Sequence, residues 1–398
     1  MTDAMTSAAP LQLDRAGMTK RSRARVSVHA DPSQALEAWA SLEAVAPVSL
    51  YQTRAWLLPW IATLGQARGV SPMIILVQDD QMRPVMLLPF GVKRRKGLNI
   101  AGFLGGKDSN FNLALCHPGH AFGPGELRAI LAQAATLAPV RPDLFVLSNQ
   151  PESWNGQANP FFALPHQPSP SFGYRTSLPA DAEAFLHARL SKDARRKLGQ
   201  KERRLAGFGA LALVHQADAA TVPAIIAAFR SQQTARLKAM GLHDIYASQA
   251  AADFLLRAST IQTGQARPAL EWHALQCGNR IVATFAGGVF GNRFHGMVTS
   301  FDGSSDVATS SPGDLLIKSI IGQCCQRGIA TFDLGVGEAR YKNTYCAEAE
   351  PLFDCLIPAS WKGRVWAQAE SLALAAKRAV KQSPVAWTLV RRIRALRV

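Results

Sequence analysis

Two separate parts of the chain show the same order of hydrophobic and polar patterns. In the first part, residues 73–78 and 83–90 are apolar runs separated by the turn Asp79-Asp80-Gln81, which predicts a β-hairpin. A further strand is expected at 98–104, a helix from Pro124 to about residue 138, and another strand at 143–147. The residues before this part, 31–66, have a helical pattern.

The second part repeats that order. A hairpin is predicted from 270–276 and 281–290, a strand at 294–300, a helix over 311–328 and a strand at 331–334. The segments Pro124-Gly125-Glu126-Leu127 and Pro312-Gly313-Asp314-Leu315 lie 188 residues apart. An internal repeat of a whole supersecondary unit indicates duplication. The sequence therefore predicts an α/β (α+β) protein built from two copies with mixed sheets.

The remaining segments suggest four regions. Residues 1–30 are expected to form a flexible basic tail, 31–165 the first copy, 166–358 the second copy and 359–398 a helical extension. A proline-rich connector spans 151–170, and helices are expected at 189–204 and 221–240. The extension is interrupted at Pro384.

Composition excludes several classes of protein. The chain has 398 residues, of which 48% are hydrophobic and 18% charged, so it is not a disordered polymer. It has no apolar run long enough to span a bilayer and no secretory signal, which predicts a cytoplasmic protein. Its six cysteines show no C-x-x-C pair and no histidine at ligand spacing, so we expect reduced core thiols and no metal site.

The net charge of +16 is concentrated in two segments. Residues 189–204 carry a net +6 and residues 359–398 a net +8, which leaves the rest close to neutral. This distribution favours local anion-facing stripes over a surface that wraps nucleic acid. The helix at 189–204 is interpreted either as a solvated face or as a grip on an anionic acceptor through Arg196, Lys197 and Arg203.

The start of the helix at 311–328 is the most informative motif. Ser311 is an N-cap residue type, Pro312 suits the first turn, Asp314 completes a capping-box pattern and Gly328 suits a left-handed C-terminus. The first-turn amides then suit a phosphate, although an ordinary capped helix has the same pattern. Gly335-x-Gly337 lacks the third glycine of a dinucleotide fingerprint, and neither a P-loop nor a nucleophile elbow is present.

The sequence resembles a known family at several of these points. Ser311-Pro312-Gly313, Phe332-Asp333-Leu334-Gly335, Tyr341-Lys342 and the basic run 190–198 are similar to GNAT-type acyltransferases related to the cellulose-synthesis-associated CelD proteins. The run from Trp56 to Gly106 shares this likeness. A more distant resemblance links the chain to the FemAB-type transferases, which carry two GNAT folds in tandem. The resemblance covers residues 35–358 and implies a tandem GNAT architecture.

The resemblance also implies a donor and a set of site residues. An acyl-CoA, such as acetyl-CoA, would bind the second copy, with its pyrophosphate over Ser310, Ser311, Gly313 and Asp314. A backbone N–H of Val298 or Thr299 would meet the acyl carbonyl, and Tyr341, with Tyr345 as a substitute, would protonate the leaving thiolate. Lys342 would neutralise developing charge, and Glu338 or Asp333 is preferred to His295 as the base.

Each of these residues also has a structural interpretation. Tyr341 could be a packed aromatic residue, Lys342 could pair with Glu338, and Asp333 could cap the turn at Gly335. The first copy lacks the polar loop before Pro124, so we expect it to have lost its own cofactor.

The function expected from this sequence is an N-acyltransferase that acts on a small-molecule or nucleotide-linked amine, in envelope or polysaccharide biosynthesis. One alternative is an aminoacyl transferase that uses aminoacyl-tRNA, the only nucleic acid expected as a partner; another is a non-catalytic scaffold of a polysaccharide synthase. The extension sets apolar residues, including Trp361, Val365, Trp366, Leu372, Trp387, Leu389, Val390 and Ile393, against basic ones. Such a helix suits either peripheral contact with an anionic inner membrane or packing between the domains.

Overall fold

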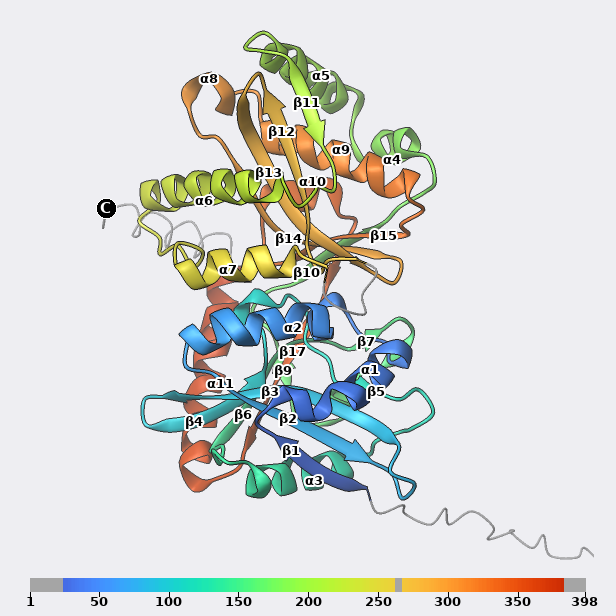
Figure 1. Ribbon diagram of the computed structural model, residues 1–398, viewed down its shortest axis with the longest axis vertical. Helices are drawn as coiled ribbons and strands as arrows, with labels where there is room; N and C mark the ends of the chain where they lie inside the picture. Colours follow the sequence, from blue (N-terminus) through green and yellow to red (C-terminus); the bar gives the residue numbers. More distant parts are fainter. Residues whose placement is uncertain (1–23, 262–266, 383–398) are drawn as a thin grey trace, which may run out of the picture.

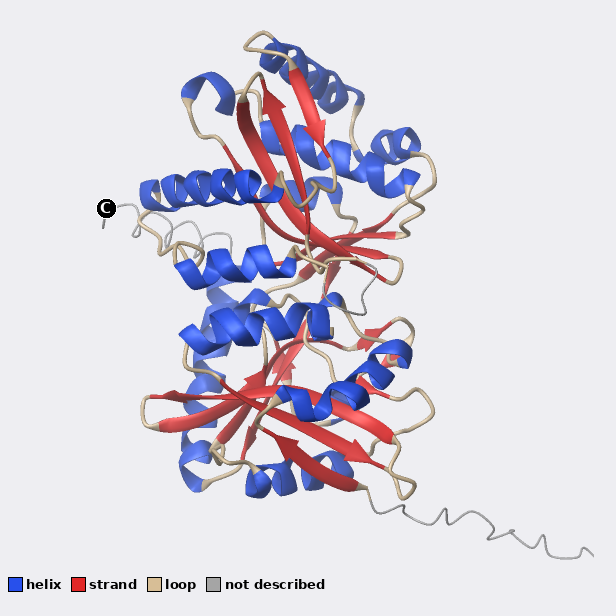
Figure 2. Cartoon of the chain, viewed as in Figure 1, coloured by secondary structure: helices blue, strands red, loops and turns tan. Residues whose placement is uncertain are grey.

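A computed structural model describes residues 24–261 and 267–382. The chain folds into two α/β halves that stack on one another along the long axis of the molecule (Figures 1 and 2). The expected tail lies mostly outside the described residues, as do Trp387, Leu389, Val390 and Ile393 of the extension.

Each half is built on one mixed sheet. The first sheet has the spatial order β1 (Arg25–His29), β2 (Ser71–Gln78), β3 (Pro84–Arg95), β4 (Leu98–Phe103), β6 (Leu144–Pro151), β17 (Leu352–Pro358) and β9 (Gln167–Pro168), with β5 (Leu115–Cys116) paired to β3. The second has the order β11 (Leu211–Val214), β12 (Glu271–Cys277), β13 (Arg280–Phe290), β14 (Arg293–Phe301), β15 (Thr331–Val336), β10 (Gly173–Ser177) and β16 (Glu348–Glu350). A short ribbon of β7 (Ser153–Trp154) and β8 (Gln157–Ala158) lies apart from both sheets.

The two sheets confirm the duplication. In each, antiparallel strands lead to one parallel pair, β4 with β6 and β14 with β15. The connection between the strands of each parallel pair contains one long helix, α3 (Pro124–Leu137) or α9 (Pro312–Gln326). The expected hairpins, strands and helices of both copies are therefore present within a few residues of their predicted bounds.

The halves exchange one strand each. β10 follows the first half in sequence but pairs with β15, whereas β17 follows the second half but pairs with β6. The expected boundary at residue 358 assigned β17 to the second copy, and the structure corrects it. The expected start at residue 31 also omits β1, which pairs with β2. An apolar strand can complete either sheet, so its local pattern does not tell which edge it joins.

The helices cover the sheets and the boundary between the halves. The first half contains α1 (Leu36–Val45) and α2 (Arg54–Trp60), so the predicted helical stretch 31–66 is divided by turns. The second half contains α4 (Ala182–Arg189), α5 (Lys192–Ala206), α6 (Val222–Ala239), α7 (Gln249–Ala258), α8 (Ser305–Ala308) and α10 (Arg340–Tyr345), and α11 (Trp361–Gln382) runs along the first half (Figure 1).

The two halves share an apolar core at their junction. Trp56 of α2 meets Phe254 of α7 edge to face, with ring centroids 5.0 Å apart, and both side chains are fully buried. Aromatic pairs of this geometry add to the free energy of burial. The junction therefore behaves as a core and not as a loose contact between two domains.

The six cysteines are unpaired, and all but Cys116 are buried.

Candidate active site

The parallel strands β14 and β15 separate after three residue pairs. Arg293 pairs with Thr331, Phe294 with Phe332 and His295 with Asp333, and the pairing with β15 ends there although β14 continues to Phe301. The register of β14 with β13 shifts after Gly296, which leaves Met297 as an extra residue. A bulge that bends one strand at this point increases the separation. The second half therefore contains a wedge-shaped opening between its parallel strands.

Asn110 of the first half closes the narrow end of this wedge. Its Oδ1 accepts a hydrogen bond from the Val336 N–H at 3.0 Å, and its Nδ2 donates to the Gly296 carbonyl at 3.3 Å. The same Nδ2 donates to the Tyr51 hydroxyl at 2.6 Å. One side-chain amide thus satisfies backbone groups on both strands where strand-to-strand bonds are lost.

The tip of α9 differs from the predicted capping box. Ser311 has a left-handed backbone (φ 47°), and neither Ser311 nor Asp314 makes a capping bond from its side chain. The Ser311 hydroxyl instead accepts from Lys201 Nζ of α5 at 2.8 Å. The Gly313 N–H has no hydrogen-bond partner within residues 24–261 and 267–382, and neither has the buried Ser310 hydroxyl. These unpaired groups suit an anionic ligand at the helix N-terminus.

Three cations surround this tip. Lys201 Nζ lies 3.9 Å from an Asp314 carboxylate oxygen. Burial raises the pKa of Asp314, whereas the charges of Lys201 and Arg340 oppose that rise. On the other side, the Arg236 guanidinium of α6 lies 5.7 Å from the centre of the Phe301 ring, at the end of β14. Against the single carboxylate of Asp314, these three cations leave the open end of the wedge with a net positive charge.

Tyr341 and Lys342 lie on α10, beyond the end of β15. Burial raises the pKa of Tyr341 to about 12, against the opposing charge of Arg236, so this hydroxyl is protonated at neutral pH. Burial lowers the pKa of Lys342 to about 8, and its Nζ donates to the Val336 carbonyl at 3.0 Å. The Tyr345 hydroxyl donates to the Asp314 carbonyl at 3.2 Å, which ties α10 to the first turn of α9.

The two candidate carboxylates are already engaged. Asp333 is buried, accepts two hydrogen bonds from Arg293 at 2.7 and 3.0 Å and accepts the Gly335 N–H at 2.6 Å. Its capping interpretation therefore holds. Glu338 lies 3.9 Å from Lys381 of α11. Neither carboxylate is a free proton acceptor at the wedge.

The predicted acceptor-binding side chains of α5 face solvent. Arg196 and Lys197 are 63% exposed, and both pair with Asp193, at 2.7 and 2.8 Å. Arg203 is exposed as well. Lys201, which the sequence reasoning missed, lies at the wedge instead. It shares a helix face with the buried Leu198 and Leu205, and this spacing was the available signal.

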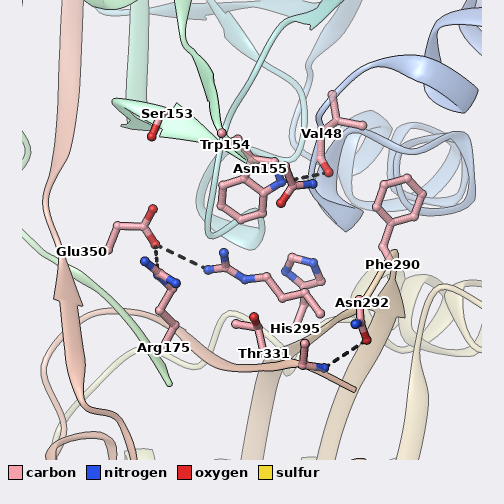
Figure 3. A pocket seen from close by; sticks show the side chains of 13 residues that line it. Val48, Ser153, Trp154, Asn155, Arg175, Phe290, Asn292, His295, Thr331 and Glu350 are labelled. Carbon is pink, nitrogen blue, oxygen red and sulfur yellow. Dashed lines mark hydrogen bonds and ion pairs between the residues drawn. The ribbon is translucent and has the colours of Figure 1, made fainter. Parts of the chain in front are cut away.

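A cavity of about 430 Å³ lies between the halves, at the starts of β14 and β15 (Figure 3). The first half contributes Val48, Ser153, Trp154 and Asn155, and the second contributes Arg175, Phe290, Asn292, Arg293, His295, Thr331 and Glu350. The Arg293 guanidinium stacks 4.1 Å from the centre of the Trp154 ring. No sequence pattern indicated this cavity, because its walls come from both halves.

The described part of the chain contains no cluster of histidine, cysteine or acidic residues able to hold a metal ion. Within the same residues, no helix combines the length and the apolar character that a bilayer crossing requires. α11 exposes Trp361, Val365 and Leu372, while Trp366 lies 5.6 Å from the Lys96 ammonium.

Comparison with known proteins agrees with this geometry. Residues 192–343 match the sequence model of the family described as "Acetyltransferase (GNAT) domain". The crystal structure of FemX is 9% identical with a TM-score of 0.56, and the alignment covers 86% of this chain and 98% of that one. A conserved protein of unknown function from Bacteroides thetaiotaomicron VPI-5482 is 10% identical with a TM-score of 0.54, over 84% and 100% of the two chains. No curated protein matches.

The chain has two GNAT folds in tandem, and residues 192–343, in the second half, are similar to the GNAT acetyltransferase family. The expected fold class is confirmed. The narrower resemblance to CelD-related proteins stays a prediction.

Proposed function

We propose that this protein is an acyltransferase that transfers an acyl group from acyl-CoA to an amine at the wedge between β14 and β15. One observation carries the proposal. The wedge opens beside the N-terminus of α9, where the Gly313 N–H has no partner among the described residues and where Lys201, Arg236 and Arg340 lie nearby. A helix N-terminus with nearby cations is a phosphate site, and CoA carries a pyrophosphate.

The donor supplies an activated thioester, so the protein has three tasks: positioning, proton removal and stabilisation of charge. The amine nitrogen attacks the thioester carbonyl carbon, the C–N bond forms, and the C–S bond breaks. The backbone of Val298 or Thr299, on the edge of β14 that β15 leaves unpaired, would donate to the developing oxyanion. Tyr341, which is protonated at neutral pH, would give its proton to the departing thiolate.

Lys342 and Asp333 act in this proposal as positioning residues. Lys342 holds the Val336 carbonyl at the end of β15, and Asp333 holds both Arg293 and the turn at Gly335. Glu338 precedes α10 and lies 3.9 Å from Lys381 of α11.

Calorimetry with acetyl-CoA tests the donor assignment. We expect binding by the wild type and about a tenfold increase in Kd for Lys201→Ala, because a charge-assisted hydrogen bond is lost. Lys197→Ala is the matched control, since Lys197 lies on the same helix but pairs with Asp193 at 2.8 Å. The absence of binding heat with acetyl-CoA and with longer acyl-CoAs would overturn the proposal.

A further inference from the structure

His295 lies where the wedge begins, on the side of the cavity between the halves. It lines that cavity, and it is also the last residue of β14 that pairs with β15. On its other edge, β14 pairs with β13: His295 lies opposite Gly288, and Val298 lies opposite Ala286. Gly288 and Ala286 are two residues apart on one strand and share a face, so the bulge places Val298 on the same face of β14 as His295.

The imidazole of His295 is oriented by its surroundings. Its Nδ1 is buried, lies 3.8 Å from an Asp333 carboxylate oxygen and has no hydrogen-bond partner among the described residues. The ring also stacks on Trp154 at 6.0 Å and meets Tyr51 edge to face at 5.7 Å. With Nδ1 turned toward Asp333, Nε2 is the nitrogen left for a ligand in the cavity.

His295 is neutral at physiological pH. Burial and the neighbouring Arg293 charge lower the pKa of this imidazole well below its ordinary value. Asp333, the other charged group near the ring, is bound to Arg293 at 2.7 Å and to the Gly335 N–H, which fixes its position. A neutral imidazole has a free lone pair and is able to accept a proton.

Both arginines of the cavity pair with carboxylates of the protein, two guanidinium groups against three carboxylates. Arg175 pairs with Glu348 at 2.6 Å and with Glu350 at 3.4 Å. Arg293 pairs with Asp333 at 2.7 Å and with Glu350 at 3.5 Å. Neither guanidinium is free to neutralise an anion. The other polar side chains of the lining, Ser153, Asn155, Asn292 and Thr331, are uncharged.

We propose that the cavity between the halves binds the acyl acceptor, a primary amine on an uncharged, hydroxyl-bearing scaffold, and that His295 Nε2 accepts the proton that the amine loses. This inference rests on the proposed function. As the C–N bond forms, the proton moves from the attacking nitrogen to Nε2 and then to solvent through the cavity. The leaving thiolate is protonated separately, so the products are an amide and free CoA thiol.

The cavity would therefore select against anionic acceptors. This differs from the anionic acceptor expected from the basic helix α5, whose Arg196 and Lys197 are exposed and paired with Asp193. An anionic group placed beside these ion pairs loses solvation without an unpaired cation to compensate for it. An amine with hydroxyl groups makes hydrogen bonds to the amide and hydroxyl side chains of the lining without that cost.

Thiol release from acetyl-CoA tests the inference, with glucosamine and glucosamine 6-phosphate as matched probes. We expect turnover with glucosamine and at least a tenfold lower kcat/KM with its phosphate. Equal or better use of glucosamine 6-phosphate would overturn the assignment of an uncharged acceptor. So would acetyl-CoA binding in calorimetry without turnover of glucosamine. A protein that binds no acyl-CoA at all would instead contradict the proposed function.

The variants His295→Gln and His295→Asn test the proton transfer. For either variant, we expect kcat with glucosamine to fall about 100-fold near pH 7 while the Kd for acetyl-CoA stays within about twofold. The loss should shrink toward pH 9, because hydroxide is then more abundant and takes the proton that the attacking nitrogen loses as the C–N bond forms. His215→Gln is the control for a general histidine effect, since His215 bonds to His273 and Ser319 away from the cavity. An equal loss at every pH would assign His295 a structural role only.

Discussion

Gly335 and Asn110 meet where the two halves join, and the space between them has no room for a side chain at position 335. A Cβ added to Gly335 would lie 2.5 Å from Asn110 Nδ2, and the backbone of Gly335 is left-handed (φ 75°). The Asn110 amide needs this space because it bonds to Gly296 and Val336 on the separating strands. The first half thus completes the narrow end of the wedge in the second.

Gly335→Ala should destabilise the protein for two reasons, backbone strain and the clash with Asn110. We expect the free energy of unfolding to fall by about 2–4 kcal/mol in denaturant titration. Gly337→Ala is the control, since Gly337 also has a positive φ (99°) but a Cβ added there would meet no heavy atom within 4 Å. A Gly335→Ala loss no larger than the control would argue against the contact with Asn110.

Tyr341→Phe should lower kcat by about 100-fold and change the Kd for acetyl-CoA little, because it removes the proposed proton donor to the thiolate. Tyr345→Phe is the comparison, since its hydroxyl bonds to the Asp314 carbonyl at 3.2 Å and supports the helix tip. We expect that variant to raise the Kd instead. Steady-state kinetics and calorimetry separate the two effects. Full activity of Tyr341→Phe would remove it from the mechanism.

Lys342 should make stability depend on alkaline pH. Its pKa is lowered to about 8 in the folded protein, whereas the pKa of a lysine in an unfolded chain is about 10.4. Between these values the unfolded chain binds more protons, so the free energy of unfolding rises with pH across this window. Relative to Lys342→Met, the wild type should gain about 1–3 kcal/mol between pH 7 and pH 10 in denaturant titrations.

The exposed Lys197 serves as the control for this pH dependence. Lys197→Met should show no corresponding change relative to the wild type, because its side chain is 63% exposed. If the difference between wild type and Lys342→Met does not vary with pH, the Lys342 ammonium is not the buried group described above.

The exchanged strands should make the halves fold together. A chain that ends at Glu350 lacks β17 and α11, which leaves the edge of β6 in the first sheet unpaired. We expect this chain to lose cooperative thermal unfolding and to aggregate, as measured by circular dichroism and light scattering. A chain that ends at Gln382 keeps both elements and should unfold like the full chain. Cooperative unfolding of the shorter chain would show that the first half is stable alone.

Exposed apolar side chains of α11 allow a test of the peripheral membrane contact expected from the sequence. Trp361, Val365 and Leu372 are 73%, 64% and 73% exposed and lie on one helix face. If they enter an anionic membrane, the triple serine variant should lose co-sedimentation with phosphatidylglycerol vesicles. Neutral phosphatidylcholine vesicles are the control. Unchanged binding of the variant would remove this stripe from any membrane contact.

Local patterns were enough to predict most of the elements. The apolar runs at 73–78 and 281–290 and the helical period of 311–328 reflect side chains that are buried in the core, so these patterns are visible in short windows. Leu315, Leu316 and Ile320 are buried as expected, and Gly328 has the predicted left-handed backbone (φ 69°). The capping box failed because Ser311 bonds to Lys201, a residue 110 positions away.

The sequence by itself determined that the chain is a duplicated α/β protein with a helix start at Pro312 suited to an anion and with Tyr341 and Lys342 just after the last parallel strand. The tertiary structure decided which half receives β10 and β17, that Asn110 closes the wedge, and that His295 faces a cavity. These features depend on contacts between segments far apart in sequence. No local period encodes such contacts, because they form only when both halves pack together.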